Sequence, residues 1–352
     1  MPISSKNSRD KLLQQLLDLV WRQWTSLGVP GDRAFAGNLV IDPEALVLIT
    51  TELGRYDSRL LDLSIDWLHS YGRGINLQRL RRLQGQWGGS DERVLSGIAE
   101  ILAEQSVMRK WKAIRETFRY SEPSEPLFIS TSGAPVPFFG EPDPRFGRYG
   151  LLRAAWEPRG ACQAPRPNRP ANLICLLRSL FGVNARAEIM AWLLTHESGH
   201  PAAIAKDTGY FSKSIQTTLN DMEDSGQIRS ERDGREKRFS LQRNDWSFLI
   251  TSPGSIEFPR WINWSPVFYF AFRTLLLLGG DDSPTASANL RAIQQRGFLD
   301  EVAPALRSSG LRSTMMANRD LTGSQLIDAI LQDVQTLGRL VENDFRPVES
   351  ER

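Results

Sequence analysis

The sequence predicts a mainly α-helical protein with one small β-hairpin near the middle of the chain. Apolar residues recur at helical spacing before residue 120 and again after about residue 244. A proline-rich stretch separates the first helices from a central segment, in which the period changes from helix to strand. We therefore expect a helical N-terminal domain (1–120), a partly ordered connector (121–170), a central domain (171–243) and a helical C-terminal domain (244–345).

Length and composition are those of a globular protein. The chain has 352 residues, 41% of them hydrophobic and 24% charged, which allows two or three domains, each with its own core. The formal net charge of +2 gives no global signal for binding a polyanion, so any basic surface must be local. The N-terminus lacks the apolar stretch of a signal peptide, and the apolar run 265–280 is short and contains Arg273. We expect a cytoplasmic protein without a membrane partner, and a buried core helix over 265–280.

The N-terminal segment has recognisable helix starts. One apolar stripe runs from Leu12 to Trp24. Asp42, Ser58 and Asn76 are expected to cap the second, third and fourth helices, because their side chains can accept hydrogen bonds from first-turn amides. A fifth helix is expected from Asp91 to about residue 119.

The connector holds ten of the twenty prolines, which excludes long helices there. We expect its most mobile parts near 121–126 and 160–170. Cys162 lies in this stretch and Cys175 follows it. A disulfide between them remains an alternative, but two free thiols in a reducing compartment are favoured.

The central segment opens with three helices. An amphipathic helix is expected over 185–196, and a second, shorter one begins at Pro201 and ends at Gly209. Ser212 is the expected cap of a third, which carries buried Ile215, Leu219 and Met222 and ends at Gly226. Two short strands over 228–231 and 238–241 then follow, joined by a turn at Asp233-Gly234.

Three helices followed by a two-stranded ribbon is the order of a winged helix-turn-helix. Residues 172–241 resemble the winged helix-turn-helix domains of bacterial transcription regulators of the MarR and ArsR kinds. The matching features are Ile204-Ala205, Gly209-Tyr210 at the turn, Leu219, Gly226-Gln227-Ile228 and a basic hairpin. The metal-binding cysteines of the ArsR kind have no counterpart, and the flanking helices do not match a MarR dimerisation pair.

The resemblance implies that the third helix is a recognition helix lying in the major groove of double-stranded DNA. Its base-facing candidates are Lys213, Gln216, Thr217 and Asn220, and its phosphate-contacting candidates are Ser212 and Ser214. The hairpin adds the cations Arg229, Arg232, Arg235, Lys237 and Arg238.

Other patterns favour simpler interpretations. Helices over 59–70 and 76–86 could form a second helix-turn-helix with Arg79, Arg81 and Arg82, although a solvated basic helix face is favoured. Asp281 and Asp282 are read as a helix start, and the aromatic residues of 261–272 as core. No phosphate-binding loop, nucleophile motif or zinc spacing is present, so we expect no catalysis, no cofactor and no metal.

The sequence thus predicts a bacterial DNA-binding protein that acts as a homodimer. A repressor, an antitoxin and a DNA-sensing subunit of an antiviral defence system all fit this prediction. The alternative is a non-catalytic subunit of a larger assembly, whose winged domain holds a protein partner.

Overall fold

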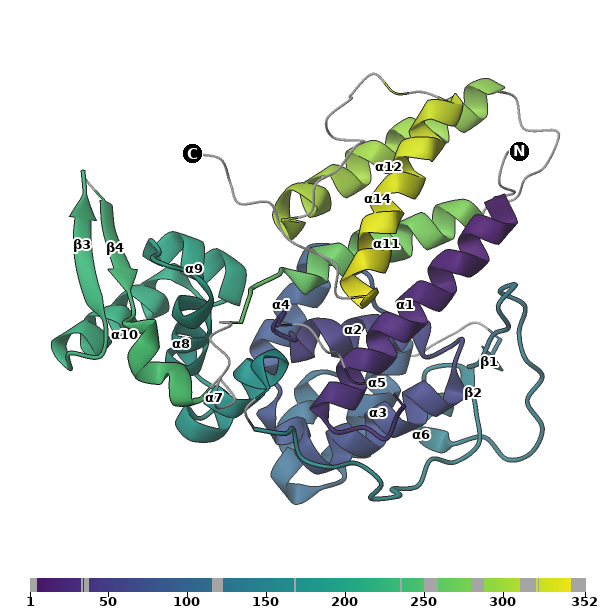
Figure 1. Cartoon of the computed structure of the whole chain (residues 1–352). Helices are drawn as coiled ribbons and strands as arrows, with labels where there is room; N and C mark the ends of the chain where they lie inside the picture. Colours follow the sequence, from purple (N-terminus) through teal and green to yellow (C-terminus); the bar gives the residue numbers. More distant parts are fainter. Residues whose placement is uncertain are drawn as a thin grey trace.

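A computed structural model describes residues 5–32, 34, 38–115, 123–167, 169–234, 236–249, 259–279, 288–310, 321 and 323–342. The protein is mainly helical, as the sequence predicted (Figure 1). Within the described residues, the β-strands form two small two-stranded sheets. None of the helices in this part of the chain is both long and apolar enough to cross a lipid bilayer.

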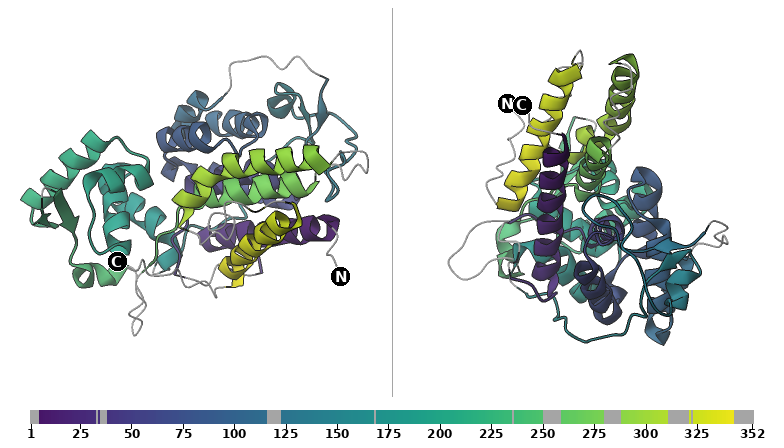
Figure 2. Two further views of the ribbon diagram at one scale, coloured as in Figure 1. Left: turned by 90° about the horizontal axis from the view of Figure 1, so that it is seen from above. Right: turned by 90° about the vertical axis from the view of Figure 1, so that its right-hand side faces the viewer.

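Most of the helices form one helical body. Its N-terminal helices are α1 (Ser5–Leu27), α2 (Pro43–Leu53), α3 (Ser58–Tyr71), α4 (Leu77–Trp87) and α5 (Glu92–Ala103), with 3-10 turns η1 (Gly72–Gly74) and η2 (Ser106–Ala113). Its C-terminal helices are α11 (Trp264–Gly279), α12 (Ala288–Ser309) and α14 (Gly323–Glu342). Helix α1 packs against α11 and α14, and buried residues of both segments belong to one hydrophobic cluster (Figure 2). The two segments thus share a core. Their division into separate N-terminal and C-terminal domains stays a prediction.

Three of the expected helix starts, at Asp42, Asn76 and Asp91, are confirmed, and the one at Ser58 lies one residue earlier. Asp42 accepts from the Ala45 amide at 3.0 Å and Asn76 from the Arg79 amide at 3.1 Å, and Asp91 caps α5. Ser58 is the first residue of α3, not its cap, because extended Asp57 precedes it and accepts from the helix amides.

The fifth helix is shorter than expected, since it ends at Ala103. Gln105 adopts an extended conformation (φ −77°, ψ 131°) and separates α5 from η2. Residues 116–119 of the expected helix lie outside the described residues.

The proline-rich connector lies along the helical body. Strand β1 (Glu125–Pro126) pairs in parallel with β2 (Leu151–Leu152), and the short helix α6 (Pro144–Gly147) buries Phe146. Further on, the carboxylate of Asp66 accepts from the amides of residues 159–161 at 2.8–3.0 Å. Residues 160–161, expected among the mobile parts, are thereby hydrogen-bonded to α3. Both cysteines are free thiols, as favoured from the sequence.

The second cluster of buried residues defines a central unit, Leu173–Leu249. It contains the helices α7 (Leu173–Phe181), α8 (Ala185–Thr195), α9 (Pro201–Thr208) and α10 (Ser212–Asp224), and the 3-10 helix η4 (Arg243–Leu249). Strands β3 (Arg229–Asp233) and β4 (Glu236–Ser240) pair antiparallel around Gly234, whose φ of 61° suits glycine at the turn. The hairpin projects at the end of the molecule away from α12 and α14 (Figure 1).

The hairpin is anchored to the helices through its second strand. The backbones of Gly199, between α8 and α9, and Phe239 of β4 exchange two hydrogen bonds of 2.8 Å. Phe239 itself is fully buried in the core of the central unit. The base of the hairpin is therefore fixed, while its turn extends outward.

Candidate nucleic-acid interface

Helix α10 has a buried apolar face and an exposed polar face. Ile215 and Leu219 are fully buried and Met222 nearly so, as the periodicity predicted. The exposed polar side chains include those of Ser212, Lys213, Ser214, Thr217 and Asn220, and the acidic Asp221 and Asp224 are exposed toward the end of the helix. The Gln216 side chain is half-buried and donates to Asn220 Oδ1 at 3.1 Å, one helical turn later. The candidate base-facing residues therefore lie along one side of the helix.

The start of α10 is uncapped. Phe211, not Ser212, occupies the cap position, and it has no side chain that could accept from the first-turn amides. Ser212 is the first helical residue, so its hydroxyl does not serve the capping role that the sequence suggested. Free N–H groups and the positive end of the helix dipole favour an anion at this position. The Phe211 ring is 68% exposed beside it.

The cations of the hairpin differ in how far they are engaged within the protein. Lys237 pairs with Glu223 of α10, which also accepts from the Ser230 hydroxyl. Arg238 Nε donates to Ser198 Oγ at 3.2 Å. Arg229 and Arg232 are exposed, whereas Arg235 lies outside the described residues.

Charge on this part of the unit is balanced. Residues 201–240 contain seven basic and seven acidic side chains. Attraction to a polyanion therefore depends on how the signs are distributed, not on net charge. Asp221, Glu223 and Asp224 lie in the second half of α10, which leaves Lys213 as the charged residue of its first half.

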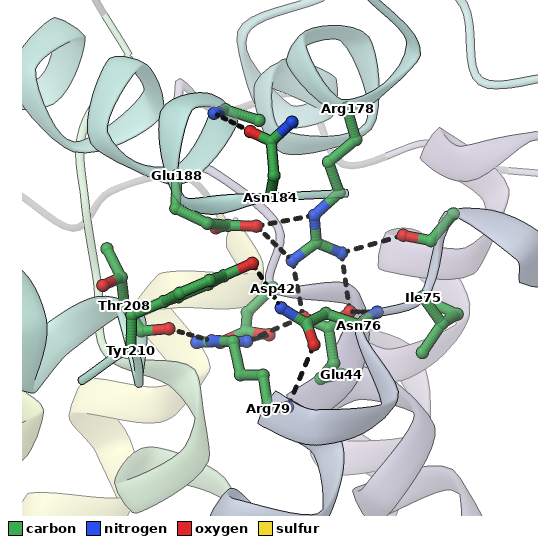
Figure 3. Close-up of polar contacts among 12 residues, drawn as sticks. Asp42, Glu44, Ile75, Asn76, Arg79, Arg178, Asn184, Glu188, Thr208 and Tyr210 are labelled. Atoms are coloured by element: carbon green, nitrogen blue, oxygen red, sulfur yellow. Dashed lines mark hydrogen bonds and ion pairs between the residues drawn. The ribbon is translucent and has the colours of Figure 1, made fainter. Parts of the chain in front are cut away.

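A buried cluster of ion pairs joins the central unit to the helical body (Figure 3). Arg79 of α4, with a side chain only 2% exposed, donates from Nη1 to Asp42 Oδ1 at 2.6 Å and to Glu44 Oε2 at 2.8 Å. Burial raises the pKa of Asp42, but the charge and hydrogen bonds of Arg79 outweigh it and leave that pKa below its ordinary value. Asp42 is therefore ionised at neutral pH.

The second arginine of the cluster comes from the central unit. Arg178 of α7 donates to both oxygens of Glu44 at 2.6 and 2.9 Å, and from Nε to Glu188 Oε1 of α8 at 2.7 Å. The backbone amide of Asn76 donates a fourth hydrogen bond to Glu44, at 2.8 Å. Glu44 thus links both arginines, and through them the two parts of the protein.

Glu188 is the least satisfied member of the cluster. Among the described residues, its Oε2 is buried without a hydrogen-bond partner. Burial raises the pKa of Glu188, and Arg178 counteracts this effect only in part. Burial therefore favours the neutral, protonated form of Glu188.

The turn between α9 and α10 is held by the same junction. Arg79 Nε donates to the Thr208 carbonyl at 2.8 Å, and Asn76 Nδ2 donates to the Tyr210 hydroxyl at 2.7 Å. Arg82 Nη1 donates to the Gly209 carbonyl at 2.8 Å. Gly209 has a φ of 76°, which ends α9 and brings these carbonyls toward α4. The orientation of α10 is thereby fixed relative to the body.

These contacts correct the interpretation of α4. Arg79 is not part of a solvated basic face or of a second DNA-reading helix, because it is buried and paired with two carboxylates. Arg81 and Arg82 remain exposed. The sequence did not indicate that Asp42, Glu44, Arg178 and Glu188 come together as one group. Glu44, Arg178 and Glu188 gave one local signal, since each is a charged residue within a mostly apolar helix.

The histidines have structural positions. His196 stacks on Trp192 with ring centroids 3.7 Å apart, and His200 caps α9. In the part of the chain that the structure describes, no group of three or more His, Cys, Asp or Glu side chains is placed to hold a metal ion. The expected helix start at Asp281 and Asp282 lies outside the described residues.

Comparison with models of protein families finds no match to this chain. Comparison with curated proteins and with solved structures finds none either.

Proposed function

We propose that the central unit is a winged helix-turn-helix and that the protein binds double-stranded DNA through it without catalysis. The observation that carries the proposal is the exposed, uncapped start of α10. That start presents Ser212, Lys213 and Ser214, while the opposite face of the helix is buried. Thr217 and Asn220 continue the polar face, at positions that a helix in the major groove turns toward base edges.

The hairpin supports the same proposal. Its base is tied to Gly199, and Arg229 and Arg232 are exposed, so both can contact a phosphate backbone beside the groove. Anchoring of the α9–α10 turn by α4 favours binding, because a helix held in one orientation loses less entropy when it docks.

The alternative is that the central unit binds a protein partner as a non-catalytic subunit of an assembly. Two observations favour it: the 68% exposed Phe211 at the start of α10, and the balance of charge over 201–240. A large exposed aromatic side chain is typical of the centre of a protein interface.

Titration of fluorescent random-sequence duplex DNA, followed by anisotropy, separates these functions. DNA binding predicts that affinity falls steeply between about 50 and 200 mM salt, because phosphate contacts release counterions. Lys213→Ala should weaken binding and reduce the salt slope by about one. Lys11→Ala, a matched change of an exposed helical lysine in the body, should do neither.

The same titration can also favour the alternative, in which the central unit binds a protein partner. Undetectable binding at the lower salt concentration, or equal behaviour of the two lysine variants, would contradict DNA binding through α10. Phe211→Ala would then be the variant to compare with wild type in partner capture.

We further infer a cytoplasmic homodimer, because helix-turn-helix proteins usually meet two half-sites of DNA with two copies. Light scattering on the full chain tests the stoichiometry, and a monomer at micromolar concentration would contradict it. Action as a repressor, an antitoxin or a defence subunit each fits such a dimer.

A further inference from the structure

A pocket of about 500 Å³ lies where the helical body, the connector and the central unit meet. Its walls come from the end of α3 and η1, from residues 164–167 of the connector and from α7. The volume lies within the range of small-molecule sites in proteins, roughly 300–1,000 Å³. None of the DNA-contacting candidates within the described residues lines it.

One side of the pocket is aromatic and apolar. Trp67 and Tyr71 line it with ring centroids 5.6 Å apart, and Ile75, Pro165 and Leu176 also take part. Trp67 is fixed in place because its Nε1 donates to the Leu27 carbonyl at 2.7 Å. Rigid aromatic walls favour a flat ring in the ligand.

The charged groups of the pocket are all basic. Arg73, Arg166 and Arg178 line it, and none of the lining residues that the structure describes is acidic. Arg178 is committed to Glu44 and Glu188, but Arg73 and Arg166 are exposed, and no described carboxylate forms an ion pair with either. Lys110 lies close by and donates from Nζ to the Arg73 carbonyl at 3.0 Å. Two unpaired cations beside apolar walls favour an anionic ligand.

The thiol in the pocket does not point to covalent chemistry. Burial raises the pKa of Cys175 to about 12, so the thiol is neutral at physiological pH. The pocket is consistent with reversible binding.

We propose that this pocket binds a small organic anion built on a flat ring. The ring lies against Trp67 and Tyr71, and its acid group, a carboxylate or a phosphate, meets Arg73 and Arg166. The proposal stands independently of DNA binding, because its residues and its readout are separate from those of α10. The occupied pocket would also contact Arg178, the arginine that links Glu44 to α8 of the central unit.

The test uses two probes with the same ring system and different charge. 8-Anilinonaphthalene-1-sulfonate carries an acid group, whereas N-phenyl-1-naphthylamine does not, and both report binding by fluorescence. The double variant Arg73→Ala/Arg166→Ala should lower the affinity for the sulfonate about tenfold and leave the neutral probe unchanged. Ser179→Trp, which fills the pocket from an exposed position of α7, should weaken both probes.

Arg81→Ala removes an exposed arginine of α4 outside the pocket and is the matched control, expected to change neither affinity. A variant with a loosened core would bind both probes more strongly for reasons unrelated to the pocket. Circular dichroism therefore checks that each variant is folded. Competition by indole-3-acetate or by adenosine 5′-monophosphate then distinguishes a carboxylate from a phosphate source.

Three results would overturn the proposal. The first is unchanged affinity for the sulfonate in the double arginine variant. The second is unchanged binding of both probes in Ser179→Trp. The third is failure of both competing anions to displace the sulfonate.

Discussion

Replacement of Arg79 by methionine should strongly destabilise the protein. The side chain is 2% exposed and binds Asp42, Glu44 and the Thr208 carbonyl. Methionine fills a similar volume but leaves three buried carboxylates, those of Asp42, Glu44 and Glu188, with one guanidinium group, that of Arg178. Breaking a buried pair from one side typically costs about 3–5 kcal/mol of unfolding free energy.

The loss should depend on pH in a defined direction. In the wild type, Arg79 holds the pKa of Asp42 low, so Asp42 stabilises the fold above its unfolded pKa. That contribution is lost as pH falls through the folded pKa. Without Arg79, burial is opposed only by the Ala45 amide and the charge of Arg178, so the pKa of Asp42 rises and the folded variant gains a proton at higher pH than the wild type does. The difference between variant and wild type should therefore be largest near neutral pH and shrink toward about pH 4.

Unfolding by guanidinium chloride, followed by circular dichroism near pH 7 and at about pH 4, measures the loss of unfolding free energy. Arg81→Met is the matched control, because Arg81 lies two positions along α4 and is exposed. We expect the control to stay within about 0.5 kcal/mol of wild type. A loss of less than about 1 kcal/mol for Arg79→Met, or a loss that grows on acidification, would refute the account of the cluster.

The remaining predictions concern the cluster and α10. Glu188→Gln should change unfolding free energy near pH 7 by less than about 1 kcal/mol, whereas Glu44→Gln should cost about 3 kcal/mol, because Glu44 serves both arginines. Equal losses in the same unfolding assay would contradict this ranking. Leu219→Ala should cost about 2–5 kcal/mol, and wild-type stability would contradict its role in the core. If DNA is bound, Gln216→Ala should reduce discrimination between a preferred site and random DNA by about 1–3 kcal/mol, and Arg232→Ala should weaken all sequences alike in anisotropy titrations. Indistinguishable effects would argue against groove reading.

The sequence by itself determined the local elements. Asp42 and Asn76 cap their helices as expected, and Gly209 and Gly234 end a helix and form a turn at positive φ. These features depend on a few neighbouring residues, so spacing and side-chain chemistry suffice to predict them. Errors occurred where neighbours compete: Asp57 displaced Ser58 as a cap, and Phe211 precedes α10 where Ser212 was expected to cap it.

The candidate interface was predictable in part for the same reason. The periodicity of Ile215, Leu219 and Met222 gave the buried face of α10, and hence its exposed residues. Which hairpin cations have partners within the protein was not predictable. Lys237 pairs with Glu223, fourteen positions earlier in the chain, and Arg238 donates to Ser198.

Only the tertiary structure decided the junction. Arg79 meets Glu44 across 35 positions of sequence, and Arg178 meets Glu44 across 134. From local sequence alone, each of these side chains is expected on a solvated surface, because burying an unpaired charge costs too much free energy. Burial becomes favourable only when all partners converge, and that convergence is a property of the packed helices, not of any local stretch of sequence.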